Sequence, residues 1–366
     1  MAENTITRRA AMAVAAGAPA LLTAQGDVVR VAVIGVGTRG SHVLRQTLKV
    51  PGVKLVAIAD INAETLARVG AEGRAAGHSP TLYADFRKML DELKDIDAVI
   101  IATPVDTHKD IAIAALEVGK SVYLEKPMAA TAEDCRMVTN AAAAAKGIFQ
   151  LGFQLRHDPN RSAAIRHIHS GAAGRILYAQ GYRHTGDLPR ETLWYFDKKR
   201  SGSNIVEQAC HILDLFTWAI GRPPLRAMGS GGINLYKDVP PGRTTMDNYS
   251  VIYEFPDDVR VNFSHIYFDP RGFSGIKERI YCSEGALDLQ TATFYPLERR
   301  DPVKLETPEA GQTADYLSAA AFIDNVRGKR KPLNNAVSAR MSTLVAILGR
   351  KAIEERRIVE WKEVDL

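Results

Sequence analysis

Two stretches of the sequence carry side chains that could move a proton to or from a substrate. In EQACHILDLFTWAIG, the residues Glu207, His211 and Asp214 stand four and three positions apart, so a regular helix would place them on one side. A histidine oriented by carboxylates can act as a general base on a hydroxyl group. The same pattern also fits a structural histidine in a partly buried helix, so both interpretations stay open.

The second stretch is YLEKPM, in which Lys126 precedes Pro127. A residue before proline favours an extended backbone, so we expect Lys126 at the end of a strand, with its ammonium group in a cleft. Beside another positive charge and partly removed from water, this lysine should have a lowered pKa. The alternative is that Lys126 is an ordinary surface lysine at the end of a strand, which the same sequence would also fit.

A third stretch, ATPVDTHKD, follows a buried apolar run. Thr103, Pro104 and His108 stand where a loop would line a cofactor site at the end of a parallel strand. The plain start of a helix explains much of the same pattern, because Thr107 and Asp110 fit a capping box.

These side chains need a scaffold, and the run VAVIGVGTRG predicts its first part. An apolar, β-branched strand leads into Gly35, Gly37 and Gly40 on the spacing G-x-G-x-x-G, where the pattern becomes helical. The glycines would allow a tight turn, the approach of a pyrophosphate to backbone N–H groups, and close packing of helix on strand. We therefore expect a dinucleotide on this turn, with Thr38 and Arg39 at the helix start.

The next strand ends in Asp60, twenty residues beyond Gly40. An acidic side chain at this place accepts hydrogen bonds from the adenosine ribose hydroxyls. Ile61 and Asn62 follow it, with no adjacent arginine to receive a 2′-phosphate, so NAD is favoured as the cofactor. Arg39 in the loop keeps NADP open as an alternative.

Strand and helix patterns alternate up to about residue 150, after which short strands with alternating apolar residues dominate. The sequence thus predicts an α/β protein: a doubly wound parallel Rossmann sheet over residues 27–150, then an α+β domain with an open, largely antiparallel sheet over residues 151–366.

Composition excludes several other classes of protein. The net charge of +5 is small for 366 residues and the basic residues are scattered, so we expect no nucleic-acid partner. Three dispersed cysteines give neither a disulfide framework nor a metal site, and we expect no bound metal. No apolar run is long enough to cross a membrane in the mature protein.

Residues 1–26 have the features of an export signal. Arg8 and Arg9 precede an alanine-rich, moderately apolar stretch, and Leu22-Thr23-Ala24 offers small residues for cleavage, so the segment resembles a twin-arginine (Tat) signal peptide. We expect a periplasmic or other extracytoplasmic protein. The alternative is an alanine-rich N-terminal helix on a cytoplasmic protein.

The combination of VAVIGVGTRG, Asp60, ATPVDTHKDIAIAALEVGKSVYLEKPM and EQACHILDLFTWAIG resembles the Gfo/Idh/MocA oxidoreductases. The resemblance implies that Lys126 and His211 face the substrate and that Glu125 helps to hold the nicotinamide ribose. It also implies a sugar or polyol substrate and a homodimer or homotetramer formed through the C-terminal sheet. Many members carry aspartate where this chain has Glu207, four residues before the histidine.

Export would require the NAD to stay tightly bound, because no pool of free NAD exists outside the cytoplasm. The bound cofactor could be recycled by a second substrate, as in glucose-fructose oxidoreductases, or within a redox-neutral glycosidase cycle. The glycosidase cycle needs a second base. A non-catalytic nucleotide sensor or scaffold is a third alternative. Further candidates for contact with substrate, three of them also candidates for that base, are Arg156, Tyr182, His184 and Tyr195.

Overall fold

The structure is a computed structural model that describes residues 28–186, 192–270, 272–273, 275–298 and 301–365. The first of its two sheets is fully parallel, with strand order β3-β2-β1-β4-β5-β6, which is the doubly wound order. Its strands are β1 (Val29–Ile34), β2 (Val53–Ala59), β3 (Thr81–Tyr83), β4 (Ala98–Ile101), β5 (Ser121–Leu124) and β6 (Phe149–Leu151).

Helices cover both faces of this sheet, because successive residues of each buried strand point to opposite sides. Val31 and Val33 belong to one apolar cluster, whereas Ala32 and Ile34 belong to the other. Side-chain caps begin three of the helices, at Asn62, Asp85 and Thr131. The helices are α1 (Thr38–Thr47), α2 (Ala63–Ala75), α3 (Phe86–Glu92), α4 (His108–Glu117) and α5 (Ala132–Ala144).

The second sheet has nine strands in the order β14-β13-β12-β11-β7-β10-β9-β8-β15. All neighbours pair antiparallel except β7 and β10, which lie parallel at the centre. The strands are β7 (Ile176–His184), β8 (Arg226–Gly232), β9 (Asn248–Glu254), β10 (Arg260–Ile266), β11 (Gly275–Cys282), β12 (Gly285–Asp288), β13 (Thr293–Pro296), β14 (Val303–Lys304) and β15 (Val359–Glu360).

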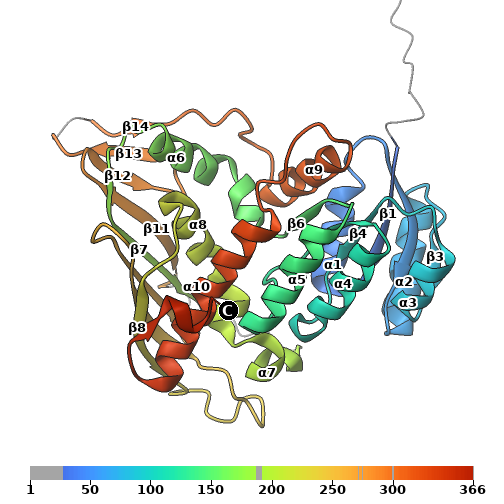
Figure 1. Ribbon diagram of the computed structural model, residues 1–366, viewed down its shortest axis with the longest axis horizontal. Coiled ribbons are helices and arrows are strands. Elements are labelled where there is room, and N and C mark those ends of the chain that lie inside the picture. The colour runs from blue at the N-terminus through green and yellow to red at the C-terminus, as the bar shows by residue number, and fades with distance from the viewer. Residues whose placement is uncertain (1–27, 187–191, 271, 274, 299–300, 366) are drawn as a thin grey trace, which may run out of the picture.

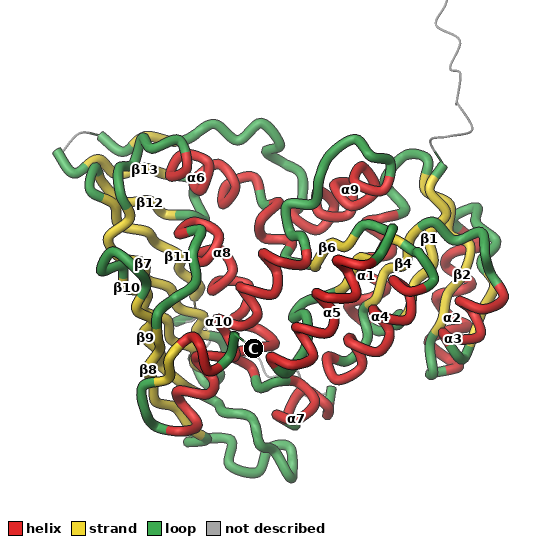
Figure 2. The backbone as a smooth tube through the Cα atoms, in the orientation of Figure 1, coloured by secondary structure: helices red, strands yellow, loops and turns green. Residues whose placement is uncertain are grey.

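Only one face of the second sheet is covered by helices (Figures 1 and 2). A Cβ at Gly181 in β7 would lie 2.9 Å from Phe216 of α8, and one at Gly229 in β8 would lie 2.8 Å from Ile353 of α10. The helices between the two sheets therefore contact the sheet directly. Those helices are α6 (Pro159–His169), α8 (Cys210–Ile220) and α10 (Ala336–Glu355), with the short α7 (Lys198–Ser201) nearby.

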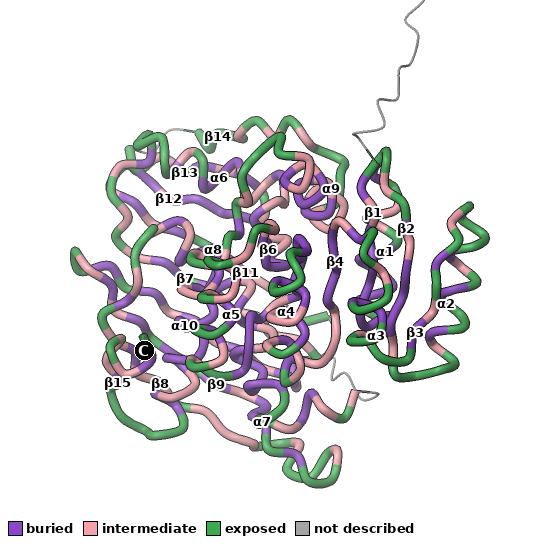
Figure 3. Tube along the Cα trace, turned by 45° about the vertical axis from the view of Figure 1, so that its right-hand side comes forward, coloured by how far each residue is buried: buried purple, intermediate pink, exposed green. Residues whose placement is uncertain are grey.

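Helix α9 (Ala314–Val326) returns from the second half of the chain to the first sheet. Phe322 and Ile323 complete the apolar cluster that contains Val31 and Val33, and the Phe322 ring meets Tyr123 of β5 edge to face at 5.5 Å. Figure 3 shows the buried strands of both sheets and α9 beside α1. The C-terminal part of the chain thus contributes to both domains.

The predicted fold class is confirmed: a parallel Rossmann sheet precedes a domain built on a mostly antiparallel sheet. Three details differ from the sequence analysis. Strand β8 was not expected, since its sequence, RAMGSGG, lacks β-branched residues. Thr107 forms no capping box, because its hydroxyl donates to the Pro104 carbonyl oxygen. The parallel pairing of β7 with β10 had no local signal.

The proposed signal peptide, residues 1–26, lies outside the described residues. Within the described ranges, no helix is both long and apolar enough to span a bilayer.

Candidate active site

The glycine-rich turn after β1 has the geometry that a dinucleotide needs. Gly35 has φ +82°, and a Cβ there would lie 2.6 Å from the Thr103 methyl group. A Cβ at Gly40 would clash with the Gly35 carbonyl oxygen, so helix and strand approach as closely as backbone allows. At Gly37 nothing lies within 4 Å of such an atom. The space at Gly37 is therefore open toward a ligand.

Helix α1 begins without the side-chain cap that begins α2, α3 and α5. Its N-cap residue is Gly37, and its first turn, which includes Thr38 and Arg39, contains no acidic residue. The first N–H groups of a helix have no partner within the helix, and they carry partial positive charge. This helix start therefore fits a pyrophosphate, as the sequence predicted.

Asp60 follows β2 at the same edge of the sheet. Its carboxylate accepts hydrogen bonds from the backbone N–H groups of Val36 (2.7 Å) and Asn62 (2.8 Å), which fixes it beside the turn. Each oxygen keeps a further lone pair for a ribose hydroxyl. The next side chain, Ile61, is 95% exposed, and an apolar group held in water beside Asp60 suits the face of an adenine. The sequence analysis did not assign Ile61 this place.

Arg39 does not lie where a 2′-phosphate would bind. Its guanidinium donates to Glu125 (2.9 Å) and to Asp315 of α9 (2.8 Å). Burial works against the charge, but Glu125, Tyr123 and Asp315 together outweigh it and raise the pKa of Arg39. Glu125 follows β5, three strands away from β2 and Asp60. The expectation that Arg39 could serve NADP is therefore wrong in its geometry: this arginine joins α1 to Glu125 and α9.

The loop after β4 lies against the glycine turn, and His108 sits behind it. The Thr107 and Thr103 hydroxyl oxygens lie 2.7 Å apart, within hydrogen-bond distance. His108 is buried, with Nδ1 at 2.9 Å from the Pro127 carbonyl oxygen and Nε2 at 2.9 Å from the Thr103 carbonyl oxygen. Burial lowers the pKa of this imidazole. Thr103 lies against the glycine turn, and its contact with a cofactor, like that of Pro104, stays a prediction. His108 joins two loops and has no ring nitrogen left for a cofactor.

Lys126, at the end of β5, forms an ion pair with Glu207. Its ammonium lies 2.7 Å from the carboxylate and 2.6 Å from the backbone carbonyl oxygen of the same residue. Burial alone would lower the pKa of Lys126, but the charge and hydrogen bond of Glu207, together with the nearby Cys210 and Glu125, outweigh it and the pKa is raised. The lowered pKa expected from the sequence is therefore wrong in the free protein, because a carboxylate faces the ammonium. Lys126 is a charged hydrogen-bond donor here.

Glu207 belongs to a π-helical turn, η4 (Ile205–Ala209), which leads directly into α8. His211 stands in the first turn of α8, and its Nδ1 is buried with no hydrogen-bond partner. Burial lowers its pKa well below 6.5, and the positive charges of Lys126 and Arg39 add to the effect. His211 is thus a neutral imidazole beside an ammonium–carboxylate pair, an arrangement that can accept a proton from a substrate hydroxyl.

Asp214 does not orient His211, contrary to the sequence prediction. Its carboxylate binds the Arg156 guanidinium at 2.6 and 2.9 Å, and both side chains are almost fully buried. His211 and Asp214 both lie in the regular helix α8, so the reason is a distant partner: the Arg156 guanidinium faces the Asp214 carboxylate, and His211 does not. Asp214 and Arg156 are a structural pair in the core, and the assignment of Arg156 to substrate contact is wrong.

Tyr182 and His184 lie on the wrong face of β7 for substrate contact. Gly181 faces Ile212 and Phe216 of α8, and residues alternate along a strand, so its neighbour Tyr182 points to the other side. There the two rings stack at 4.5 Å, and His184 bonds Ser264 at 3.0 Å. The sequence showed the alternation without showing which face the helices cover.

Tyr195 is buried, and its hydroxyl lies 2.6 Å from that of Tyr267. Burial raises the pKa of Tyr195 well above 10, so it is not placed to act as a base. Tyr267 donates in turn to the Gln208 side chain at 2.8 Å, and Arg183 donates to the same oxygen. Gln208 and Arg183 were missed, although Arg183 stands two residues from Gly181 and so shares its face.

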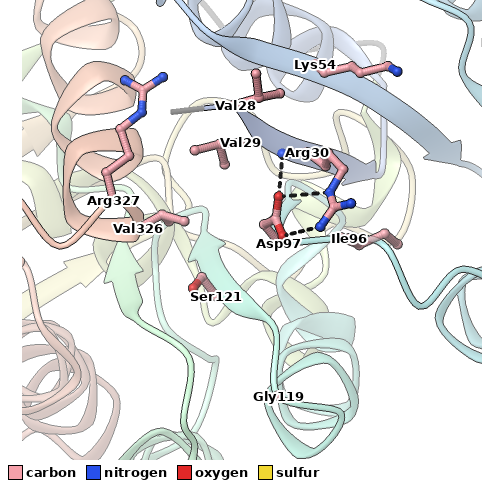
Figure 4. A pocket seen from close by; sticks show the side chains of 10 residues that line it. All are labelled: Val28, Val29, Arg30, Lys54, Ile96, Asp97, Gly119, Ser121, Val326 and Arg327. Atoms are coloured by element: carbon pink, nitrogen blue, oxygen red, sulfur yellow. Dashed lines mark hydrogen bonds and ion pairs between the residues drawn. The ribbon is translucent and has the colours of Figure 1, made fainter. Parts of the chain in front are cut away.

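A separate cavity of about 680 Å³ lies at the amino ends of the parallel strands (Figure 4). Arg30 and Asp97 form its central ion pair, at 3.0 Å. It opens at the edge of the sheet opposite Gly37 and Lys126, so it is not part of the site described above. Over the described residues, no cluster of histidine, cysteine and carboxylate side chains is arranged to hold a metal ion.

Comparison with known families agrees with this geometry. Residues 29–153 match a model described as the oxidoreductase family, NAD-binding Rossmann fold, and residues 162–288 match one described as the GFO/IDH/MocA C-terminal domain. The NAD-binding domain and the domain that carries the second sheet are thus matched separately, and together they make up most of the chain.

Among curated relatives, scyllo-inositol 2-dehydrogenase (NAD(+)) of Bacillus subtilis (strain 168) is 32% identical over 56% of this chain and 58% of its own length. The chain therefore spans little more than half of that relative. A structure of levoglucosan dehydrogenase in complex with NADH has a TM-score of 0.80 at 21% identity, over 91% of this chain and 98% of its own. The structure of aldose-aldose oxidoreductase from Caulobacter crescentus has a TM-score of 0.78 at 19% sequence identity, and the match covers 91% of this chain and 99% of that one. The chain belongs to the Gfo/Idh/MocA oxidoreductase family.

Proposed function

We propose that the protein oxidises a hydroxyl group of a sugar or polyol, with NAD as the hydride acceptor. The observation that carries this proposal is the meeting of a neutral His211 with the Lys126–Glu207 pair at the carboxyl edge of the NAD-binding sheet. The inositol dehydrogenase name of the curated relative supports a polyol substrate.

Residues of the chain fit the cofactor at three points. The free N–H groups of α1 and the open space at Gly37 would hold the pyrophosphate, Asp60 the adenosine ribose, and Glu125 the nicotinamide ribose. Bound there, NAD would supply the acceptor for the hydride of the carbinol carbon. No residue that the structure describes substitutes for that acceptor.

The proton follows a separate path through the side chains. Lys126 donates a hydrogen bond to the substrate oxygen and so favours the developing alkoxide. His211 takes the hydroxyl proton as the carbonyl forms. Because burial and nearby positive charge disfavour the imidazolium, His211 releases the proton to solvent and returns to its neutral form. Glu207 keeps Lys126 protonated throughout.

The direct test is the absorbance of NADH at 340 nm when the purified protein meets NAD and a panel of inositols and aldoses. We expect reduction of NAD with at least one of them, and loss of NADH binding in Gly37→Asp, which places a carboxylate where the pyrophosphate approaches. Failure of NAD and NADH to bind the wild-type protein would contradict the proposal. If the Lys126→Ala variant still binds NADH and keeps its role in the cell, the protein is a sensor or scaffold and not an enzyme.

The redox-neutral glycosidase remains the second proposal, and it has weaker support. It requires a base for a carbon-bound proton, and of the candidates Tyr182 and His184 face away from the site while Tyr195 has a raised pKa. Aryl glycosides in heavy water separate the two activities. Release of the aglycone with deuterium next to the oxidised carbon would favour the glycosidase, whereas oxidised product only in the presence of an acceptor would favour the dehydrogenase.

We also propose export by a Tat-type signal, tight binding of the cofactor and assembly through the outer face of the nine-stranded sheet. That face is not covered by helices and carries the partly exposed Ile252. Cell fractionation of the full chain tests the export. Adenine absorbance after gel filtration tests retention of the cofactor. Light scattering of the wild type and of Ile252→Lys tests the assembly, which we expect the substitution to weaken.

A further inference from the structure

We propose that Arg183 binds a carboxylate group of the substrate, so that the site takes a sugar acid or polyol acid in preference to the uncharged compound. The inference rests on the proposed function, because it names the substrate class of the same site.

The position of Arg183 follows from the register of β7. Two residues earlier, Gly181 packs against the middle of α8. One pleat further along the strand, Arg183 reaches the π-helical turn and donates from Nε to the Gln208 side-chain oxygen at 3.3 Å. Gln208 is the immediate neighbour of Glu207, and His211 follows one turn later. The guanidinium therefore lies beside the residues assigned to proton transfer.

One hydrogen bond joins Arg183 to Gln208, which is itself held by Tyr267. The oxygen of Gln208 also accepts from Tyr267 at 2.8 Å, and the Tyr267 hydroxyl lies 2.6 Å from that of Tyr195. Because Nε is occupied, the two terminal nitrogens of the guanidinium remain as donors, and neither has a partner among the residues that the structure describes. Two parallel N–H donors fit the two oxygens of a carboxylate.

The charges around Arg183 are not balanced. Three other arginines of this region each face a carboxylate: Arg39 faces Glu125, Arg156 faces Asp214, and Arg161 faces Glu278. Within the described ranges no carboxylate pairs with Arg183, and the nearby Glu207 is already bound to Lys126. A partly buried cation without a counterion is unfavourable. A carboxylate on the substrate would supply the missing negative charge.

A purely structural role makes a different prediction. If Arg183 only supports Gln208, its removal would weaken all ligands of the site alike. If it binds a carboxylate, its removal would weaken acids alone. Matched pairs of ligands separate the two roles: D-glucuronate with D-glucuronamide, and D-galacturonate with D-galactose. Glucose 6-phosphate adds an anion of different shape.

The experiment measures the dissociation constants of these ligands by calorimetry on the full protein saturated with NADH. The wild type should bind each acid about 10- to 100-fold more tightly than its neutral partner. Arg183→Gln should reduce that ratio to near one while NADH binding is unchanged. Arg260→Gln serves as the control, since it removes the same charge from the far end of neighbouring β10, where Arg260 faces Asp258.

Three results would overturn the inference: equal affinity for acid and neutral partner in the wild type, a ratio that survives Arg183→Gln, or a preference for the phosphate over every carboxylate. Hydride transfer is read separately at 340 nm. Acid binding that depends on Arg183 without any NADH formation would contradict the proposed function alone, whereas oxidation of neutral polyols with no acid preference would contradict this inference alone.

Discussion

Two ion pairs hold the helical segment formed by η4 and α8 against chain that follows strands of the parallel sheet, and they differ in their access to water. Lys126–Glu207 lies in the cleft, with side chains 11% and 14% exposed, whereas Arg156–Asp214 lies in the core at 2% and 0%. Both join a residue that follows a strand of the parallel sheet to the same segment. The outer pair is therefore available for chemistry, while the inner pair fixes α8 in the core.

The largest effect on stability is expected from breaking the inner pair. Asp214→Asn leaves the Arg156 guanidinium buried without a counterion, which should lower the free energy of unfolding by about 3–5 kcal/mol. Urea unfolding followed by circular dichroism measures it. The exposed pair Arg260–Asp258 provides the control, since Asp258→Asn should cost less than about 1 kcal/mol. Equal losses in both variants would mean that burial gives the Arg156–Asp214 pair no special weight in stability.

The outer pair should show the opposite behaviour. In Lys126→Met we expect kcat to fall by about 10²- to 10⁴-fold, because the donor to the substrate oxygen is lost. The loss of stability should be smaller than in Asp214→Asn, since Glu207 keeps contact with water. NADH fluorescence confirms that the cofactor site is intact. If Lys126→Met lost most of its stability but its folded molecules kept the wild-type kcat, Lys126 would be a structural residue and not the donor to the substrate oxygen.

The pH dependence of the outer pair gives a finer test. Glu207 raises the pKa of Lys126, so activity that needs the ammonium is lost only as pH rises through that raised value. In Glu207→Gln burial acts without the opposing charge, the pKa falls, and the alkaline limb of kcat/KM moves to lower pH. At acid pH the wild type should stay active below 6.5, because the neutral form of His211 persists there. The measurement is kcat/KM of the wild type and of Glu207→Gln between pH 5 and 11. If the alkaline limbs of the two profiles coincide, Glu207 does not set the pKa of Lys126.

The smallest effect is expected on the outer face of the second sheet. Tyr182→Phe and His184→Gln should change kcat/KM by less than about twofold, within the few tenths of a kcal/mol usual for surface changes. Their neighbour Arg183, on the inner face, should respond strongly. Steady-state kinetics on one sugar acid compares all three variants. A large loss in Tyr182→Phe would mean that the outer face reaches the substrate.

Much of the scaffold follows from local patterns. The β-branched run before Gly35, the glycine spacing and the strand-end Asp60 all depend on neighbours in sequence, and the structure places them as these patterns predict. Lys126 was located by the proline that follows it. Each of these signals lies within a few residues of the feature that it predicts.

The remaining contacts depend on residues far apart in the chain. Asp214 meets Arg156 across 58 positions, and Arg39 meets Asp315 across 276. Nothing near Asp214 shows that a guanidinium, not His211, will face it. The alternation in β7 likewise separates Arg183 from Tyr182 without telling which of the two meets α8. The sequence therefore located the segments of the site better than the partners of individual side chains.

The path of α9 has a consequence for how the molecule could be divided. Phe322 and Ile323 are anchored in the first domain, and α10, which follows, packs on the second sheet, so two stretches of chain bridge the halves. A proteolytic cut between residues 153 and 159 would then leave both fragments associated. A truncated protein ending at residue 153 would expose the apolar strip under α9 and aggregate.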